Sequence, residues 1–292
     1  MLIGSIESGG SKMVCAVGDE NLKIIDMKYF LTSTPKKTLS KLIEYFHKFD
    51  LQALGIASFG PLDLDTKSKN FGTILQSPKL DWRNVPIYKI LKQQLHIPIY
   101  LTTDVNGSAY GEYVINRLRG ENLNSLVYYT VGTGIGAGVI YHGQFIGDLG
   151  HTEMGHVYVK RHPMDKEFDG VCPYHHDCLE GLASGPSIEA RLGKRSEEVS
   201  LNNSIWDLIA YYIAQALVQT TMVLRPGKFV LGGSVVNETL FEKVRNQYHQ
   251  LINHYISLPP LNQYIVRPMV SHNGSATIGN FALGIKALNH GY

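Results

Sequence analysis

Two cysteines and two adjacent histidines gather within the segment GVCPYHHDCLEG, residues 170–181. Thiolate sulfur and imidazole nitrogen are ligands that Zn²⁺ prefers, and a structural zinc site takes about four of them. The pattern C-x-x-H-x-x-C supplies three, at Cys172, His175 and Cys178. His176 is a rival for the middle position, and a reduced cysteine pair beside surface histidines is the alternative to any metal. The segment therefore predicts a metal site whose purpose the spacing leaves open.

Three glycine-rich turns, each beside an apolar run, could hold phosphate groups. Glycine lets a backbone approach a phosphate closely and donate N–H groups to it. One such turn is weak evidence, because most glycine pairs only reverse the chain, but three favour a nucleotide site. The turns are IESGGSK (6–12), VGTGIGAG (131–138) and VLGGS (230–234).

The turns do not match two familiar nucleotide motifs. No G-x-x-x-x-G-K-[ST] occurs, which excludes a P-loop. GTGIGA resembles the dinucleotide pattern, but GVIYHGQF after it predicts a strand and not the helix that such a site needs. Each half instead begins with a hairpin, in which a glycine turn joins two strands. Two such hairpins could bind nucleotide phosphates between them.

Asp104 follows the predicted strand 97–103, and open α/β sheets place their ligands at such strand ends. A carboxylate there can accept the proton of an attacking hydroxyl. The alternative is that Asp104 only caps the helix predicted over 105–118, and both roles can coexist. Lys12 is either a point charge for phosphates or a solvated lysine.

Strands and helices alternate along the chain, which predicts an α/β protein with two similar halves. The polar segment 119–124 is the candidate boundary, and 204–224 is apolar on nearly every side and so predicted to be buried. Strands are predicted at 3–6, 13–17, 24–30, 53–59, 97–103, 126–132, from 136, at 228–233 and at 264–268. Helices are predicted at 34–49, from 86, and at 105–118, 204–224, 238–256 and 275–288.

The composition is that of a globular protein, with 44% hydrophobic and 18% charged residues and a formal net charge of +2. The near-neutral charge gives no reason to expect nucleic acid or a membrane surface as partner. We expect no membrane span, because we see no apolar run close to roughly 20 residues. We also expect no signal peptide at MLIGSIESGG. An odd cysteine count, with two in a histidine-rich cluster, favours a reducing cytoplasm over a disulfide framework.

The motifs together resemble the ROK family of sugar kinases over essentially the whole chain. The chain is most similar to the fructokinase branch, which carries IEAGGTK and CPYHGDCLEGLASGPAI-type sequences. The resemblance implies an actin-like ATPase or hexokinase fold, with two RNase-H-like lobes closing a cleft over ATP and sugar. Its lobes would be 1–118 and 119–292, with the final helix, 275–292, packing back on the first lobe. The residues that carry the resemblance are IESGGSK, TDVNGSAYGE (103–112), VGTGIGAGVI (131–140), GHTEMGH (150–156), CPYHHDCLEGLASGPSI (172–188) and LGGS (231–234).

The resemblance also assigns roles to individual residues. Asp104 would be the general base. Asn106 would support its turn or reach the sugar, and Glu153, His156 and Glu180 would contact sugar hydroxyls. ATP and its phosphates would meet Gly9, Gly10, Ser11, Lys12, Thr133, Gly134, Gly136, Gly185, Pro186, Gly232 and Gly233.

For the metal, the resemblance adds His156 as a fourth ligand and favours His175, because relatives have glycine at the position of His176. His162 is a weaker rival to His156. Four protein ligands leave no open position, so the zinc in loop 156–178 would be structural. We expect it to fix the loop that presents Glu153 and Glu180. This chain has two cysteines where the usual ROK pattern has C-x-C-G-x-x-G-C.

The implied reaction is ATP + D-fructose → ADP + D-fructose 6-phosphate, with Mg²⁺ as cofactor. Thr103, where the family's glucokinases have asparagine, agrees with the fructokinase branch, whereas Glu7 replaces a usual aspartate. Alternatives are a kinase for mannose, glucose or N-acetylmannosamine, or a non-catalytic sugar-binding regulator. Repressors of the family carry a helix-turn-helix ahead of the first phosphate strand, which here starts at Leu2. We expect a cytoplasmic homodimer.

Overall fold

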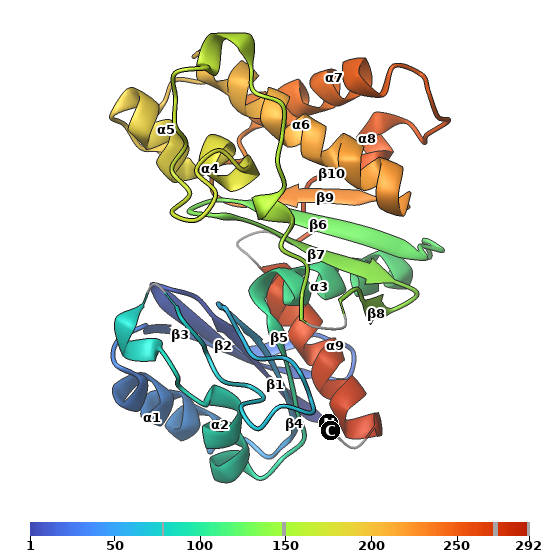
Figure 1. Ribbon diagram of the computed structural model, residues 1–292. Coiled ribbons are helices and arrows are strands. Elements are labelled where there is room, and N and C mark those ends of the chain that lie inside the picture. The colour runs from blue at the N-terminus through green and yellow to red at the C-terminus, as the bar shows by residue number, and fades with distance from the viewer. Residues whose placement is uncertain (78, 148–149, 271–273, 291–292) are drawn as a thin grey trace. The chain divides into compact units, whose positions relative to one another are not determined.

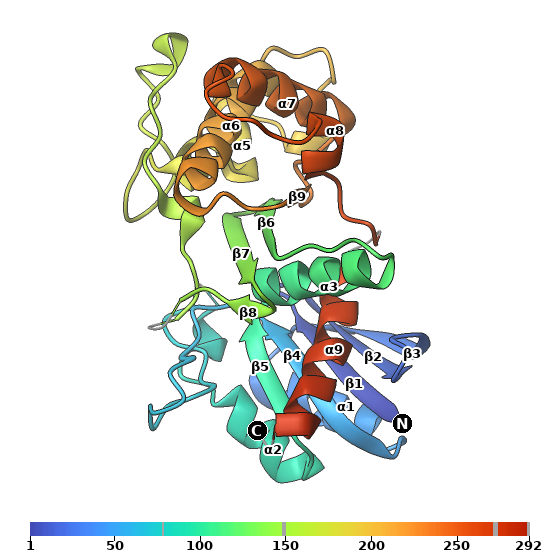
Figure 2. The same ribbon diagram turned by 90° about the vertical axis from the view of Figure 1, so that its right-hand side faces the viewer.

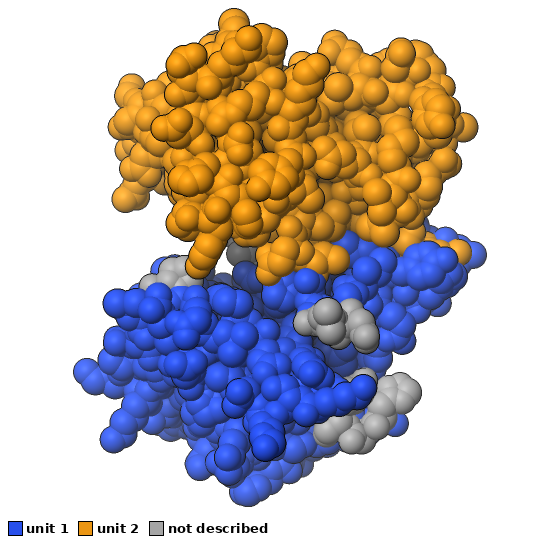
Figure 3. Space-filling model, in the orientation of Figure 1, with its two compact units in different colours: residues 1–122, 138–151, 269–292 blue, residues 123–137, 152–268 orange. Residues whose placement is uncertain are grey.

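The chain divides into two compact units, which Figure 3 colours separately. Unit 1 is re-entered twice, by the middle of the chain and by its last helix. The computed structural model describes residues 1–77, 79–147, 150–270 and 274–290. Unit 1 comprises 1–122, 138–151 and 269–292, and unit 2 comprises 123–137 and 152–268.

The strands form two five-stranded mixed sheets, in the orders β3-β2-β1-β4-β5 and β10-β9-β6-β7-β8 (Figure 1). In the described part of the chain, the strands are β1 (Leu2–Ser8), β2 (Lys12–Asp19), β3 (Ile24–Leu31), β4 (Leu51–Ser58), β5 (Ile99–Thr103), β6 (Ser125–Val131), β7 (Ile135–Tyr141), β8 (Gln144–Phe145), β9 (Phe229–Gly232) and β10 (Ile265–Val266). The α-helices are α1 (Pro35–Phe46), α2 (Ile87–Leu95), α3 (Asp104–Leu118), α4 (Leu179–Ala183), α5 (Gly185–Leu192), α6 (Ile205–Leu224), α7 (Glu238–Ile252), α8 (Leu261–Tyr264) and α9 (Gly274–His290).

The sheet of unit 1 brings three strand ends to one edge. β1 runs antiparallel to β2 and parallel to β4, which is parallel to β5. Ser8 of β1 pairs in register with Ser58, and Ser58 pairs with Thr103 of β5. The glycine turn after β1 and the start of α3 after β5 therefore lie along the same sheet edge.

Helices cover both faces of this sheet (Figures 1 and 2). α1 and α2 lie on one face, and the predicted amphipathic stripe of α1 is confirmed by burial of Leu39, Leu42 and Phe46. α9 packs on the other face against β1, β4 and α3. Its approach to β4 is close, because a Cβ on Gly55 would lie 1.9 Å from the carbonyl oxygen of Asn280. Glycine at 55 is therefore required where the final helix meets the sheet.

Unit 2 is built around α6, which packs against α7 and α4. The helix is apolar and long enough to cross a membrane by length and composition, contrary to the expectation that no segment would be. Half of its most apolar window is buried inside the protein, as in a core helix. The prediction of burial on nearly every side is wrong at its end, where the Val223 side chain is 78% exposed.

Most predicted elements are confirmed in type, but three were predicted too long. The helix predicted at 34–49 ends at Phe46. α7 ends at Ile252 and not at 256, because Asn253 and His254 adopt left-handed backbone conformations. The predicted strand 264–268 shortens to β10, since Leu261–Tyr264 form α8. Residues 291–292 of the expected final helix lie outside the described part.

Candidate functional site

The first glycine turn, between β1 and β2, is held by backbone contacts. The Gly9 N–H donates to the Lys12 carbonyl at 3.0 Å, and a Cβ on Gly9 would lie 2.7 Å from that oxygen. Thr32 clamps the turn, since its hydroxyl donates to the Gly9 carbonyl at 2.8 Å and its N–H donates to the Ser11 carbonyl at 2.9 Å. The turn is thus fixed, with Gly10, Ser11 and Lys12 exposed along it.

The Lys12 ammonium group is engaged within unit 1. It lies 5.3 Å from the ring centroid of Tyr29, a cation–π distance. The side chain is also exposed to solvent, so both alternatives for Lys12 stay open. A cation beside the glycine turn remains available to an anion, because a cation–π contact at an exposed site is worth only about 0.5–1 kcal/mol.

Asp104 is the first residue of α3 and is exposed. The helix cap is the preceding Thr103, whose hydroxyl oxygen accepts from the Asn106 N–H at 3.3 Å. The alternative in which Asp104 caps the helix is therefore wrong. Its own Oδ1 accepts from the next backbone N–H, of Val105, at 2.9 Å. These contacts place a carboxylate at the positive end of a helix dipole, on the same sheet edge as the first glycine turn.

Asn106 supports this helix start from within the protein. Its side chain is 4% exposed, and its Nδ2 donates to the Thr102 hydroxyl at 3.1 Å. It also lines a cavity of about 240 Å³ in unit 1, whose walls include the aromatic rings of Phe71, Tyr88 and Phe145. The turn-supporting role expected of Asn106 is visible directly in these contacts.

The second glycine turn, between β6 and β7, is joined to the cysteine segment by Glu180. The Gly132 N–H donates to the Gly134 carbonyl at 2.9 Å, and the Ile135 N–H donates to Glu180 Oε2 at 2.8 Å. A Cβ on Gly134 would lie 2.6 Å from that carboxylate oxygen. Gly136 follows within β7 and is half-buried. The turn and the acid therefore hold each other in place.

A cavity of about 260 Å³ opens beside this second turn in unit 2. It includes three of the expected nucleotide contacts, but Gly232 and Gly233 are not among its lining residues. Gly232 is buried instead, where a Cβ would lie 2.5 Å from the Tyr128 hydroxyl, and Gly233 takes a positive φ of 102° to turn the chain. The residues lining the cavity are Gly132, Thr133, Gly185, Pro186, Glu189, Arg195, Ser196, Glu197, Ser234 and Val235.

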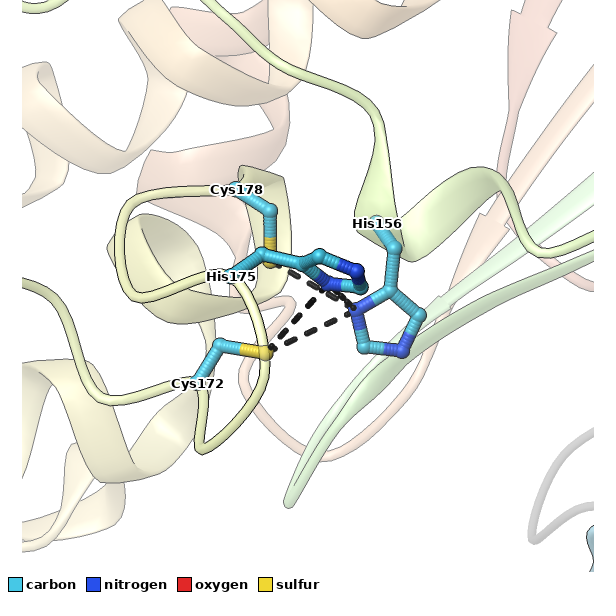
Figure 4. A group of neighbouring side chains, drawn as sticks. All are labelled: His156, Cys172, His175 and Cys178. Atoms are coloured by element: carbon cyan, nitrogen blue, oxygen red, sulfur yellow. Dashed lines mark hydrogen bonds between the residues drawn. The ribbon is translucent and has the colours of Figure 1, made fainter.

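His156, Cys172, His175 and Cys178 converge in unit 2 (Figure 4). Their ligand atoms all lie within 4.8 Å of one another. The His156 and His175 Nδ1 atoms are 3.3 Å apart, and His156 Nδ1 lies 3.5 Å from Cys178 Sγ and 3.7 Å from Cys172 Sγ. His175 Nδ1 lies 3.8 Å from Cys172 Sγ.

These separations suit a tetrahedral zinc ion. Zinc bonds of about 2.3 Å to sulfur and about 2.0–2.1 Å to nitrogen require an N–N distance of about 3.3–3.4 Å and N–S distances of about 3.5–3.6 Å. The N–N and N–S distances of the cluster lie within about 0.3 Å of those values. The donor set, two sulfurs and two imidazoles, is also one that zinc takes in structural sites.

The rival histidines lie elsewhere. His162 Nδ1 accepts from the Met164 N–H, and His176 is exposed with a left-handed backbone. The His176 carbonyl oxygen lies close to Gly170 and Gly181. A Cβ on these glycines would lie 2.0 and 1.8 Å from that oxygen. Burial raises the pKa of the Cys178 thiol to about 11, and the neighbouring Cys172 adds to the rise. A bound cation would instead lower the pKa of both thiols and hold both sulfurs as thiolates.

The sequence profile of the ROK family matches residues 3–287. The chain belongs to the ROK family. This ROK protein is 50% identical over 290 residues to a fructokinase of Streptococcus mutans, an alignment that covers 98% of both chains.

Solved structures carry the same fold. A ROK hexokinase from Thermus thermophilus superposes with a TM-score of 0.81 at 21% identity, over 99% of both chains. A ROK glucokinase from Streptomyces griseus, solved with glucose and AMPPNP, gives 0.73 at 20% identity over 98% of this chain and 100% of its own. The expected actin-like, hexokinase-type α/β fold is confirmed for this ROK protein.

Sequence reasoning missed several cavity residues of this ROK protein. Ser234 is the last residue of the turn VLGGS, in which only the two glycines were expected to contact the nucleotide, and Val235 lies one position beyond that turn. Glu189 lies one helical turn beyond Pro186 on α5, a spacing that could have indicated it. Arg195 caps a short 3₁₀ helix, Ser196–Glu198, which contains Ser196 and Glu197 and carries no such spacing signal.

Proposed function

We propose that this ROK protein is a fructokinase, which transfers the γ-phosphoryl group of ATP to the 6-hydroxyl of D-fructose. The observation that carries the proposal is 50% identity, over 98% of both lengths, to a fructokinase. A protein of Lactococcus lactis with the same name is 48% identical over 96% of both chains.

The proposed general base is Asp104. Its exposed carboxylate accepts the proton of the sugar hydroxyl while the hydroxyl oxygen attacks the γ-phosphorus and ADP leaves. The start of α3 supports this role, because Thr103 takes over the capping of the helix. Asn106 holds the same turn from behind and is proposed to meet the sugar.

The nucleotide is proposed to use the glycine turns and the cavity of unit 2. Mg²⁺ bound with ATP supplies charge neutralisation for the phosphates, and Glu7, at the end of β1, is the carboxylate nearest in sequence to the first turn. Backbone N–H groups at both turns can donate to phosphate oxygens. The residues proposed to contact ATP are Gly9, Gly10, Ser11, Lys12, Thr133, Gly134, Gly136, Gly185 and Pro186, with Gly232 and Gly233 shaping the turn that precedes Ser234.

The sugar is proposed to meet Glu153, His156 and Glu180. Zinc would anchor the loop near both Glu153 and Glu180. Its ligands would be His156, Cys172, His175 and Cys178. Glu153 lies three residues before His156, and its carbonyl accepts from the His156 N–H at 3.0 Å. Glu180 lies two residues after Cys178, and one of its oxygens is fixed by Ile135. We further propose a homodimer acting in the cytoplasm, where reduced cysteines are the rule.

A sugar panel tests the proposal. With Mg-ATP and coupled detection of ADP, kcat/KM for fructose should exceed that for mannose, glucose and N-acetylmannosamine by about 10²-fold or more, since a site that hydrogen-bonds hydroxyls rejects misplaced ones strongly. A preference for another sugar would make that sugar the substrate. Turnover of none of them would contradict the kinase assignment and leave the sugar-binding regulator.

Substitution of Gly134 by alanine tests the second glycine turn. The new Cβ would lie 2.6 Å from Glu180 Oε2, so the turn or the acid must move. We expect KM for ATP to rise about tenfold, equivalent to ~1.4 kcal/mol of lost binding. Gly120→Ala is the control, because Gly120 has a positive φ but no atom within 4 Å of its Cβ position. It should lower Tm without changing KM; an equal KM rise in both variants would contradict the turn's role.

A further inference from the structure

A buried ion pair joins α5 to the segment that precedes the cysteines. Arg191 donates from Nε to Asp165 Oδ1 at 3.0 Å and from Nη2 to Oδ2 at 2.7 Å. The two side chains are 9% and 7% exposed. The buried Tyr212 hydroxyl donates to the same carboxylate at 2.7 Å. This bidentate pair is the kind of geometry that fixes a guanidinium group in one orientation.

The rest of the Arg191 guanidinium is also used. Its Nη1 donates to the Leu182 carbonyl at 3.0 Å and to the carbonyl and hydroxyl of Ser187 at 3.0 and 3.1 Å. The Arg191 Cζ atom lies 3.7 Å from the ring centroid of Phe168. Leu182 belongs to α4 and Ser187 to the first turn of α5, so one side chain pins the corner between the two helices.

A second arginine ties the same segment to the metal loop. Arg161 donates from Nε to Asp177 Oδ2 at 3.1 Å and from Nη1 to the Asp165 and Phe168 carbonyls. Asp177 immediately precedes Cys178. Together the two arginines connect the cysteine loop, the segment 161–168 and the α4–α5 corner, all within unit 2.

That corner carries nucleotide-cavity residues. Gly185 and Pro186 begin α5, and Glu189 follows one turn later on the same eight-residue helix. We propose that Asp165 and Arg191 are positioning residues for the nucleotide: they hold α5 so that its first turn and Glu189 form the cavity wall. The inference rests on the proposed kinase function, in that the cavity is assigned to ATP.

The use of a charged pair at this buried position favours a role in positioning α5 over a role in stability alone. A buried ion pair roughly balances its desolvation cost, and hydrophobic residues of similar volume often replace such pairs without loss of stability. Apolar side chains could not donate to the Leu182 and Ser187 carbonyls, however. The corner would keep the bond from the Ser187 hydroxyl to the Leu182 carbonyl, at 3.0 Å, but would lose the bonds that Arg191 makes. Replacing Asp165 and Arg191 together by hydrophobic residues therefore distinguishes a role in positioning α5 from a role in stability.

The test is the double variant Asp165→Leu/Arg191→Met, with the exposed pair variant Glu238→Leu/Arg267→Met as control. Dissociation constants for AMPPNP and KM for ATP should rise about tenfold in the first, since small misplacements of binding groups carry costs of this order. Zinc content, KM for sugar and kcat at saturating ATP should stay near wild-type values, whereas Tm should fall because the buried Tyr212 hydroxyl loses its acceptor. The control should change none of these quantities.

Unchanged AMPPNP affinity in the folded double variant would overturn the proposal. Should that variant fail to fold, Arg191→Lys supplies the measurement, because lysine keeps the charge for Asp165 but has no fork to reach both carbonyls. A nucleotide affinity weakened about threefold or more supports positioning, and wild-type affinity overturns it. AMPPNP binding needs no turnover, so a wild-type protein that binds AMPPNP but phosphorylates no sugar contradicts the proposed function alone.

Discussion

Replacing Asp104 by asparagine should lower kcat by about 10³-fold while leaving KM for sugar within about threefold of the wild-type value, because general base catalysis contributes about 10²–10⁴-fold. The amide keeps the shape of the side chain and can accept a hydrogen bond at one oxygen, but it cannot take the hydroxyl proton. Steady-state kinetics with fructose and Mg-ATP measure both constants.

Asp207→Asn is the matched control for this variant. Asp207 also lies in the first turn of a helix, α6, so its loss removes a similar helix-dipole interaction of about 0.3–1 kcal/mol without touching the proposed site. Its kcat should equal that of the wild type. Activity that survives in Asp104→Asn, or an equal loss in the control, would show that another group is the base.

Removal of one cysteine ligand, Cys178→Ala, should abolish stoichiometric zinc and raise KM for fructose by about tenfold or more. Structural zinc contributes folding free energy directly, so a loop left with three ligands loses the anchor beside Glu180. Elemental analysis reports the metal, and a fructose saturation curve reports the sugar site. The affinity for AMPPNP should change much less, because Gly185 and Arg191 anchor the cavity helix independently.

Two control experiments test whether the loss of zinc is specific to the four proposed ligands. Cys15→Ala changes a cysteine that is equally buried but lies in unit 1, so zinc should remain at one per chain. The neighbours His175 and His176 make a second comparison, in which alanine at 175 should lose zinc and alanine at 176 should retain it. Unaltered sugar kinetics in zinc-free Cys178→Ala protein would refute the idea that the metal positions the sugar loop.

Local sequence patterns predicted the elements well because they depend on neighbouring residues only. The spacing of Leu39, Leu42 and Phe46 predicted the buried face of α1, and Pro35 predicted its first turn. The C-x-x-H-x-x-C spacing likewise indicated residues that one loop brings together. The upstream His156 needed the family resemblance, since nothing in its own neighbourhood singles it out.

Contacts between distant segments were beyond the reach of such patterns. The bond from Ile135 to Glu180 joins a turn to a helix 45 residues away, and Asp165 meets Arg191 across 26 residues. Asp165 ends a three-residue 3₁₀ helix, Pro163–Asp165, which is too short for any periodicity to indicate which side chains point inward. The sequence also does not indicate which neighbours surround a glycine. Gly232 was therefore expected at the nucleotide, but it lies against Tyr128 instead.

The packing of α9 on the sheet of unit 1 has a consequence for biosynthesis. A ribosome releases β1 to β5 first and α9 only after the whole of unit 2, since the helix starts at Gly274. Until then the sheet face bearing Ile3, Ala16 and Ala53 lacks its partner Phe281. The first unit of the chain to be synthesised is therefore the last that can complete its core, and the nascent protein carries an uncovered apolar face through most of translation, the kind of surface that chaperones bind.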